Sequence, residues 1–155
     1  MTAARLLGAE RSMILRYGDS GDAGEHDKSR VVGYLSAALC DAEGRMLGQA
    51  RTIAQHLGAV PDAMQSVLAE FRDDLHPGDV VAMNDPYQGG MHIPDVFLFM
   101  PIFWEGALEA FAVVIGHQTD MGGRVPGSNS SDSTEIYQEG LRLPPVKLFK
   151  RGKLD

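Results

Sequence analysis

The chain has 155 residues, of which 44% are hydrophobic and 23% are charged. This length and composition are typical of a folded domain with a packed core, and they exclude a disordered chain. The 21 acidic residues outnumber the 14 basic ones, for a net charge of -7, so no nucleic-acid-binding surface is expected. We therefore predict a single domain over residues 1–155.

Three features predict a cytoplasmic location. The single cysteine, Cys40, cannot form an internal disulfide and is expected to be a small core residue. Charged residues interrupt the apolar residues near the N-terminus, unlike those of a secretory signal. The longest apolar run, residues 96–104, is far shorter than the ~20 residues that span a bilayer.

The first predicted elements are a helix and a loop. Apolar residues recur in residues 3–16 with a spacing typical of one amphipathic helix. Residues 17–30 are polar and charged and contain three glycines, which predicts a flexible loop.

A hairpin and a second helix are predicted next. Residues 31–40 are rich in strand-forming residues, and Asp41–Gly44 has the composition of a turn before a second apolar stretch. Residues 60–71 have apolar side chains at three- and four-residue steps, as an amphipathic helix does. Pro61 would then lie in the first turn of that helix, where proline is tolerated.

The second half of the chain is predicted to be rich in strands. Residues 80–83, 96–104 and 107–117 are apolar runs, and Glu105-Gly106 between the last two has the length of a tight hairpin turn. Asn84-Asp85-Pro86 favours a turn, so Asp85 is expected to be structural. The fold class predicted is α+β, with antiparallel β-hairpins and a few helices.

Two similar tetrapeptides flank the predicted long hairpin. They are His92-Ile-Pro-Asp95 and His117-Gln-Thr-Asp120. If Glu105-Gly106 forms a two-residue turn, His117 pairs with Pro94 across the hairpin. His92, Asp95 and His117 would then converge at the end of the hairpin that is far from the turn.

Two imidazoles and one carboxylate are a ligand set that suits Zn, Mn or Fe. Three protein ligands leave coordination positions for water or substrate, as catalysis requires. Asp120 would be a fourth ligand or would orient one of the histidines. The alternative is that each histidine is an ordinary hydrogen-bonded residue, and a one-residue slip of register would change which side chains meet.

Other chemistry has no motif to support it. The glycines of Gly89-Gly90 and Gly122-Gly123 shape a pocket or turn the chain, but they do not match a phosphate-binding loop. Neither Cys40 nor any serine lies in a nucleophile motif. The chain is therefore not expected to bind ATP alone or to form a covalent intermediate.

Three segments resemble hallmark blocks of the hydantoinase B/oxoprolinase family: GDVVAMNDPYQGGMHIPD, HQTDMGGRVPGS and EIYQEGLRLPPVKL. An upstream segment, DAEGRMLGQARTIAQHLGAVPDAM, resembles the family's hairpin and following helix. The resemblance covers nearly everything after residue 33. It implies the N-terminal part of a larger α+β fold, because family subunits are several times longer than this chain.

The resemblance also implies a divalent metal and a hetero-oligomer with an ATP-using hydantoinase A-type subunit, which phosphorylates a carbonyl oxygen of a small molecule. The family's metal-binding positions match His92, Asp95 and His117. Asp120 and Glu139 are the candidate catalytic residues, although Glu139 could instead hold the turn that follows it. His56 also lies in a matching block and either lines the pocket or caps and packs.

The resemblance leaves three functions open. The chain would act in ATP-dependent hydrolysis of a cyclic amide such as a hydantoin or 5-oxoproline, in ATP-dependent carboxylation of a ketone, or as a non-catalytic scaffold subunit. Tyr34 stands where many hydrolytic members have an aspartate ligand, which favours the carboxylase branch. That fourth ligand would be absent, supplied by Asp120 or Asp41, or replaced by water.

Overall fold

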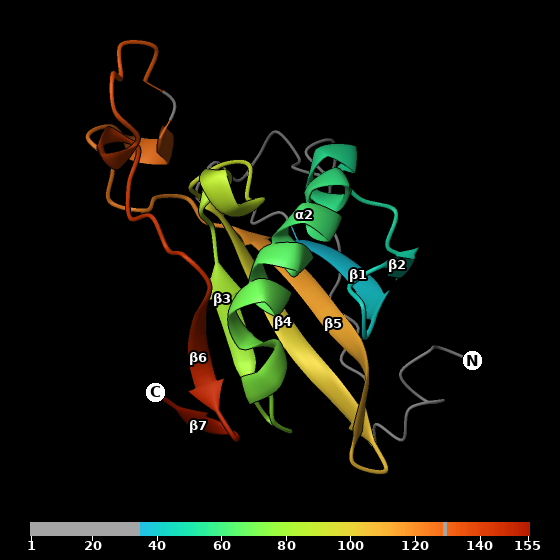
Figure 1. Ribbon diagram of the computed structural model, residues 1–155. Coiled ribbons are helices and arrows are strands. Elements are labelled where there is room, and N and C mark those ends of the chain that lie inside the picture. The colour runs from blue at the N-terminus through green and yellow to red at the C-terminus, as the bar shows by residue number, and fades with distance from the viewer. Residues whose placement is uncertain (1–34, 129) are drawn as a thin grey trace, which may run out of the picture. The chain divides into compact units, whose positions relative to one another are not determined.

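A seven-stranded antiparallel sheet with one long helix on a face forms the part of the chain that the structure describes (Figure 1). The structure is a computed structural model and describes residues 35–128 and 130–155. They belong to one unit, Gly33–Asp155. The predicted α+β class, with antiparallel hairpins, is confirmed, whereas the helix expected over residues 3–16 and the loop over 17–30 lie outside the described residues.

The strands lie side by side in the order β2-β1-β5-β4-β3-β6-β7, and every neighbouring pair is antiparallel. Their bounds are β1 Leu35–Asp41, β2 Met46–Gln49, β3 Val80–Met83, β4 Asp95–Trp104, β5 Ala107–His117, β6 Val146–Lys150 and β7 Lys153–Leu154. The helix is α2, Ala54–Phe71, and short 3₁₀ turns occupy Arg72–Asp74, Pro86–Gln88, Pro126–Ser128 and Ile136–Gln138. The hairpin predicted around Asp41–Gly44 and the strand over residues 80–83 are confirmed.

The long hairpin of β4 and β5 turns at Glu105 and Gly106, as predicted. Both residues have positive φ, 48° and 86°, which is the geometry of the two-residue turn that best matches strand twist. A bulge follows: Phe103 pairs with Leu108, but Ile102 pairs with Ala110, so Glu109 is an extra residue in β5. The predicted pairing of His117 with Pro94 is therefore wrong by one residue, and His117 lies opposite Asp95.

The hydrophobic core lies between α2 and one face of the sheet. Alternate residues of the central strands point to this face, among them Phe97, Phe99, Phe111, Val113 and Ile115, all almost completely buried. From α2 they meet Val60, Ala63, Met64, Val67 and Leu68. Burying such side chains contributes about 1.5–3 kcal/mol each.

Cys40 is buried in this core, as predicted. Burial, with a smaller contribution from the charge of Asp41, raises the pKa of the Cys40 thiol to about 11. The thiol is therefore protonated at neutral pH and behaves as a small apolar side chain.

Helix α2 begins earlier than predicted, at Ala54 rather than residue 60, so the expectation that Pro61 lies in its first turn is wrong. Proline inside a helix costs ~3 kcal/mol because it removes one hydrogen bond and crowds the preceding turn. Leu57 and Val60 in the preceding turns are buried against the sheet, and two such side chains offset that cost. Across the described residues, no helix has both the length and the apolar character needed to cross a membrane.

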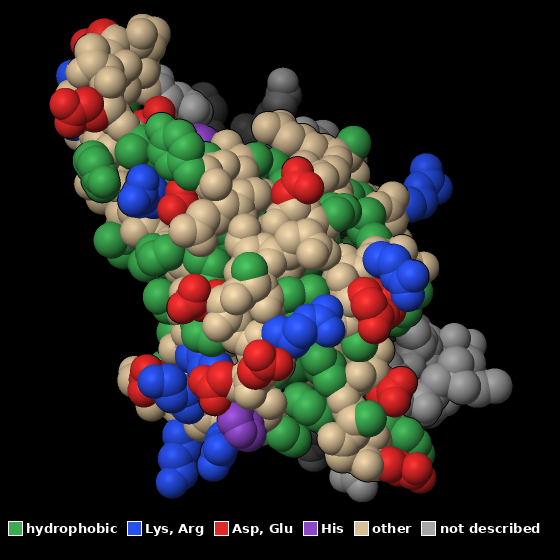
Figure 2. Space-filling model, in the orientation of Figure 1, with side chains coloured by type: hydrophobic (Ala, Val, Ile, Leu, Met, Phe, Trp, Pro, Cys, Tyr) green, Lys and Arg blue, Asp and Glu red, His purple; other side chains and the backbone are tan. Residues whose placement is uncertain are grey.

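Charges of both signs are mixed over the face of the molecule that Figure 2 shows. One pair is buried: the Asp79 carboxylate lies 3.0 Å from Lys147 Nζ, and both side chains are at most 5% exposed. Asp79 also accepts hydrogen bonds from the backbone N–H groups of His76 and Arg151, at 3.0 and 2.7 Å. It thereby ties the turn before β3 to the β6–β7 hairpin.

Asp79 makes the stability of this fold sensitive to acid. Burial alone would raise the pKa of Asp79, but the backbone hydrogen bonds and Lys147 together lower it below its ordinary value of 3.8. The unfolded chain then binds more protons than the folded one near that pH, so stability rises with pH and is lost as pH falls through the folded-state pKa.

Asp79→Asn should lower the free energy of unfolding by about 2 kcal/mol above about pH 5, because Lys147 loses its buried carboxylate partner and keeps only the exposed carboxylate of Asp74, 2.9 Å away. The difference from the unmodified protein should shrink as the pH falls below 3.8, the ordinary pKa of the carboxyl group. Urea unfolding at a series of pH values measures both effects. Asp73→Asn, at an exposed position nearby, serves as the control, and an equal loss in both variants would contradict the argument.

Candidate metal centre

The candidate metal ligands lie where the buried stripe of the long hairpin ends. Asp95 pairs with His117, and the next pair on the same face is Phe97 with Ile115. The pair of Asp95 and His117 thus lies on the same face as the core residues, one step beyond the last apolar pair. Its side chains are a carboxylate and an imidazole rather than apolar groups. Asp95 is buried, and His117 is partly exposed.

His92, Asp95 and His117 come together as predicted. His117 Nδ1 lies 2.7 Å from Asp95 Oδ1, and His92 Nδ1 lies 3.7 Å from Asp95 Oδ2. The two imidazole rings are stacked, with centroids 5.8 Å apart. One potential ligand atom from each residue lies within 4.8 Å of the others.

The charge of Asp95 is stabilised although the side chain is buried. Burial by itself would raise the pKa of Asp95, but the contacts with His56 and His117 outweigh it and lower the pKa. Asp95 is therefore an anion at neutral pH, with a histidine on each side of the carboxylate.

These residues fit a divalent metal ion. Neutral imidazole and carboxylate groups are the ligands that Zn, Mn and Fe accept. His92 Nε2 is buried and has no hydrogen-bond partner within the described part of the chain. A buried imidazole nitrogen without a partner is costly, and coordination to an ion would satisfy it.

Asn84 holds the loop that carries His92. Its side-chain amide donates to the carbonyl groups of Ile93 and Leu141, at 2.7 and 2.9 Å. Its side-chain oxygen accepts from the backbone N–H of Leu143 at 2.6 Å. Asn84 is completely buried, so these bonds clamp the His92 loop to the segment that leads into β6. Asp85 is structural, as predicted, because it accepts from the N–H of Tyr87 at 3.0 Å.

Gly89 allows the same loop to touch α2. Its φ is +95°, and a Cβ atom there would lie 2.4 Å from the backbone nitrogen of Ala63. Neither feature is compatible with a larger residue. Of the two roles predicted for this glycine pair, Gly89 turns the chain at the end of the 3₁₀ turn, and it also lets two backbones approach closely.

Asp120, Glu139 and Asp41 are not part of the three-residue cluster. Asp120 is exposed and accepts a hydrogen bond from the N–H of Gly122 at 2.8 Å. Glu139 is partly buried and helps to line a cavity of about 380 Å³ together with Tyr87 and Met91, the residue before His92. Asp41 lies at the opposite end of β1 and binds Arg45, so it is not positioned to replace the missing ligand.

His56 and Ser36 extend the site into the core. His56, near the start of α2, is buried, with Nδ1 2.9 Å from Ser36 Oγ and Nε2 3.5 Å from Asp95 Oδ1. In the sequence, His56 stood out only because it lies in a block that resembles the family. Two roles were left open for it there: lining the pocket, or capping and packing. Nothing in the sequence indicated Ser36, because its contact with a residue 20 positions away depends on the tertiary fold.

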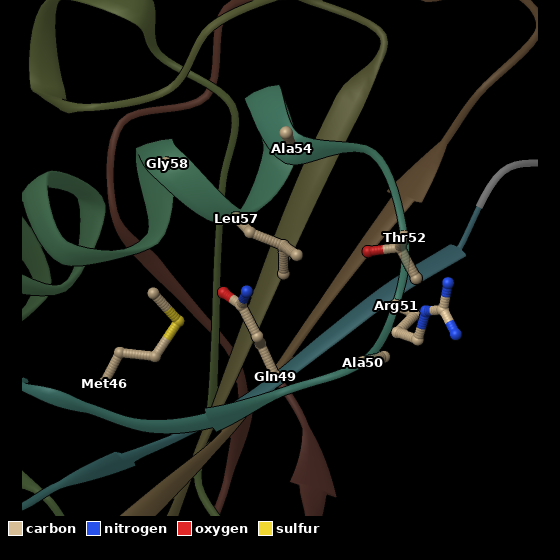
Figure 3. A pocket seen from close by; sticks show the side chains of 8 residues that line it. All are labelled: Met46, Gln49, Ala50, Arg51, Thr52, Ala54, Leu57 and Gly58. Atoms are coloured by element: carbon tan, nitrogen blue, oxygen red, sulfur yellow. The ribbon is translucent and has the colours of Figure 1, made fainter.

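A separate cavity of about 370 Å³ lies along the connection from β2 to α2. Gln49, Thr52 and Leu57 are among its lining residues, and Figure 3 shows them around the space beside the start of the helix. None of its lining residues belongs to the cluster of His92, Asp95 and His117.

The fold and the cluster together define a chain with a candidate metal centre at one end of an antiparallel sheet. Residues 33–155 match the hydantoinase B/oxoprolinase family, and the chain belongs to that family. The resemblance seen in its sequence blocks is thereby confirmed.

Similar proteins include the caprolactamase subunit beta of Pseudomonas jessenii, 44% identical over 76% of this chain and 20% of that protein. The 5-oxoprolinase 1 of Arabidopsis thaliana is 33% identical over 76% of this chain and 9% of that protein. The chain thus spans about a fifth of the first relative and less of the second.

Two solved structures share the fold. The ATP-dependent caprolactamase of Pseudomonas jessenii superposes with a TM-score of 0.73 at 43% identity, covering 77% of this chain and 21% of that one. Nucleotide-free acetone carboxylase superposes with a TM-score of 0.68 at 27% identity, covering 78% of this chain and 16% of that one. The chain is therefore related to both ATP-dependent hydrolases and ATP-dependent carboxylases.

Gly89→Ala should destabilise the protein by about 2 kcal/mol more than Gly106→Ala. Both glycines have positive φ, but a Cβ atom at Gly106 meets nothing within 4 Å, so the difference isolates the contact of the His92 loop with α2. Chemical unfolding of the two variants measures it. Equal losses would show that backbone conformation, rather than close packing, decides the effect.

Proposed function

We propose that this chain supplies the metal-binding part of an ATP-dependent enzyme that hydrolyses a cyclic amide. The observation that carries the proposal is the convergence of His92, Asp95 and His117 on one end of the sheet, in a chain of this family. A divalent Zn, Mn or Fe ion held there supplies Lewis acidity toward a carbonyl group and water.

The residues of this chain have two kinds of role at the proposed metal centre: some are ligands and others position the ligands. Asp95 contributes the negative charge, and His92 and His117 contribute neutral nitrogen ligands on either side of it. Asn84 and Gly89 hold the His92 loop in place, so the ligand set is positioned before any ion binds.

Glu139 and Asp120 are the proposed catalytic residues. Glu139 helps to line the cavity beside Met91, the neighbour of His92, and from there it can accept a proton from water or donate one to a departing nitrogen. Asp120 holds the turn at Gly122 through one carboxylate oxygen, which leaves the other for substrate or for orienting a ligand.

ATP is proposed to bind to a hydantoinase A-type partner subunit, in a hetero-oligomer. This chain has no phosphate-binding loop, and the caprolactamase relative is itself a beta subunit. Phosphorylation of the carbonyl oxygen by the partner would make the amide carbon more electrophilic, and water would then complete the hydrolysis. Dependence on ATP is consistent with the cytoplasmic location that the sequence led us to expect.

Hydrolysis is favoured over carboxylation because the caprolactamase relative is 44% identical. Carboxylation of a ketone remains the second candidate, supported by the likeness to acetone carboxylase at 27% identity and by Tyr34 in place of an aspartate. The two reactions differ in their need for bicarbonate.

Metal content tests the site directly. The purified chain should hold about one divalent ion after loosely bound ions are removed, and His92→Ala and His117→Ala should each lose it, because two ligands rarely retain the metal. Elemental analysis measures the content. His76→Ala, at a histidine outside the cluster, is the matched control and should keep its ion.

A chain without metal, or with equal metal in all three variants, would count against a metal centre at these residues. The chain would then be better described as a scaffold subunit.

Bicarbonate distinguishes the two reactions. When the chain is assembled with its ATP-using partner, ATP turnover stimulated by a lactam should proceed without bicarbonate, because water is the only other reactant in hydrolysis. Turnover that starts only after bicarbonate and a ketone are added would favour the carboxylase. In either case His92→Ala should abolish turnover without preventing assembly, whereas full turnover in that variant would support the scaffold.

A further inference from the structure

A buried polar chain runs from β1 through α2 to the candidate metal centre. Ser36 Oγ lies 2.9 Å from His56 Nδ1, and His56 Nε2 lies 3.5 Å from Asp95 Oδ1. The three residues are 1%, 5% and 3% exposed. They come from three different elements, β1, α2 and β4, and meet at the end of the core where the apolar stripe stops.

The positions of the protons in these contacts follow from the chemistry of the Asp95 carboxylate and the Ser36 hydroxyl. A carboxylate that binds a metal ion is deprotonated and can only accept hydrogen bonds. A proton on His56 Nε2 can be donated to Asp95 Oδ1, 3.5 Å away, and in the tautomer that carries this proton Nδ1 is an acceptor. The Ser36 hydroxyl is the donor to that nitrogen at 2.9 Å. One tautomer of His56 thus satisfies both contacts.

Two simpler roles do not fit these residues. Ser36 is poorly suited to be a nucleophile because it is 1% exposed and lines neither of the two cavities described above. His56 does not belong to the three-residue ligand cluster, and both of its ring nitrogens face protein partners.

We propose that His56 is a positioning residue for the metal centre, which holds the Asp95 carboxylate toward His92 and His117, and that Ser36 holds His56 in the tautomer this requires. The inference rests on the proposed metal binding. His56 approaches the same oxygen, Oδ1, that contacts His117, so Oδ2 is left facing His92. Rotation of the carboxylate would break both arrangements.

Groups that orient a metal ligand in this way commonly change metal affinity 10- to 100-fold when they are removed. His56→Leu keeps an apolar side chain in the core but removes the donor to Asp95, so the Kd for zinc should rise by about that factor. His56→Gln retains an amide N–H that can reach Asp95, and its zinc affinity should stay within about 3-fold of the unmodified protein. Ser36→Ala should fall between them.

The experiment is a zinc titration of the full chain against a chromophoric chelator, with the unfolding of the metal-free variants measured in parallel. Val67→Ala is the control, because Val67 is completely buried in the same helix but belongs to neither the polar chain nor the ligand cluster. It should lower stability without changing the Kd for zinc. A role of His56 in packing alone would make His56→Leu behave like Val67→Ala.

The outcomes separate this inference from the proposed function. If the unmodified chain binds no zinc, the proposed metal centre fails, and the role of His56 fails with it. If the chain binds zinc and His56→Leu binds it equally well, the metal centre stands and the positioning role is overturned. Should His56→Leu not fold, Ser36→Ala decides: a weaker zinc affinity supports the role, and an unchanged affinity overturns it.

Discussion

The pairing of β4 with β5 determines which side chains meet at the end of the sheet. The strands have a side-chain period of two, so a shift of one residue would move a whole set of side chains to the other face. The extra residue Glu109 sets the observed register, in which Asp95 lies opposite His117. The same register places Phe97 with Ile115 and Phe99 with Val113 on the face that α2 covers, so core and candidate site are built by one pairing.

A carboxylate at the end of a hydrophobic stripe needs compensation, because burying an isolated charge is far more costly than burying an apolar side chain. In this fold the compensation comes from elements far apart in the sequence: His56 from α2 and His117 from β5. The start of α2 therefore has two tasks. Leu57 and Val60 add to the core, and His56 reaches the polar end of it.

The sequence predicted most of the fold because its signals were local. Apolar runs and strand-forming residues located the strands, Glu105-Gly106 between two such runs located the turn, and the two H-x-x-D elements located the three clustered residues. Glu109 has no local feature that distinguishes a bulge from a regular strand position, so the register was predicted one residue out. The start of α2 was missed because proline was expected at the start of the helix, whereas packing against the sheet outweighed its cost. The contact of Ser36 with His56 and the bonds of Asn84 to Leu141 and Leu143 join residues 20 to 59 positions apart, which no local pattern specifies.

The bulge also divides the hairpin into two parts that should differ in their tolerance to insertions and deletions, which is useful for protein engineering. Glu105 and Gly106 lie beyond it, exposed, with nothing within 4 Å of a Cβ atom at Gly106. A peptide graft at the tip would lengthen a surface loop while the ten-residue ladder behind it keeps its alignment, which makes the tip a natural place for an affinity tag or a fluorescent label. Deleting Glu109, only three residues further along, would instead shift the pairing of β5 with β4 by one residue. That shift would reach the opposite end of the hairpin and change which residue lies opposite Asp95. Tolerance to insertion and deletion thus changes abruptly within a few positions of one turn.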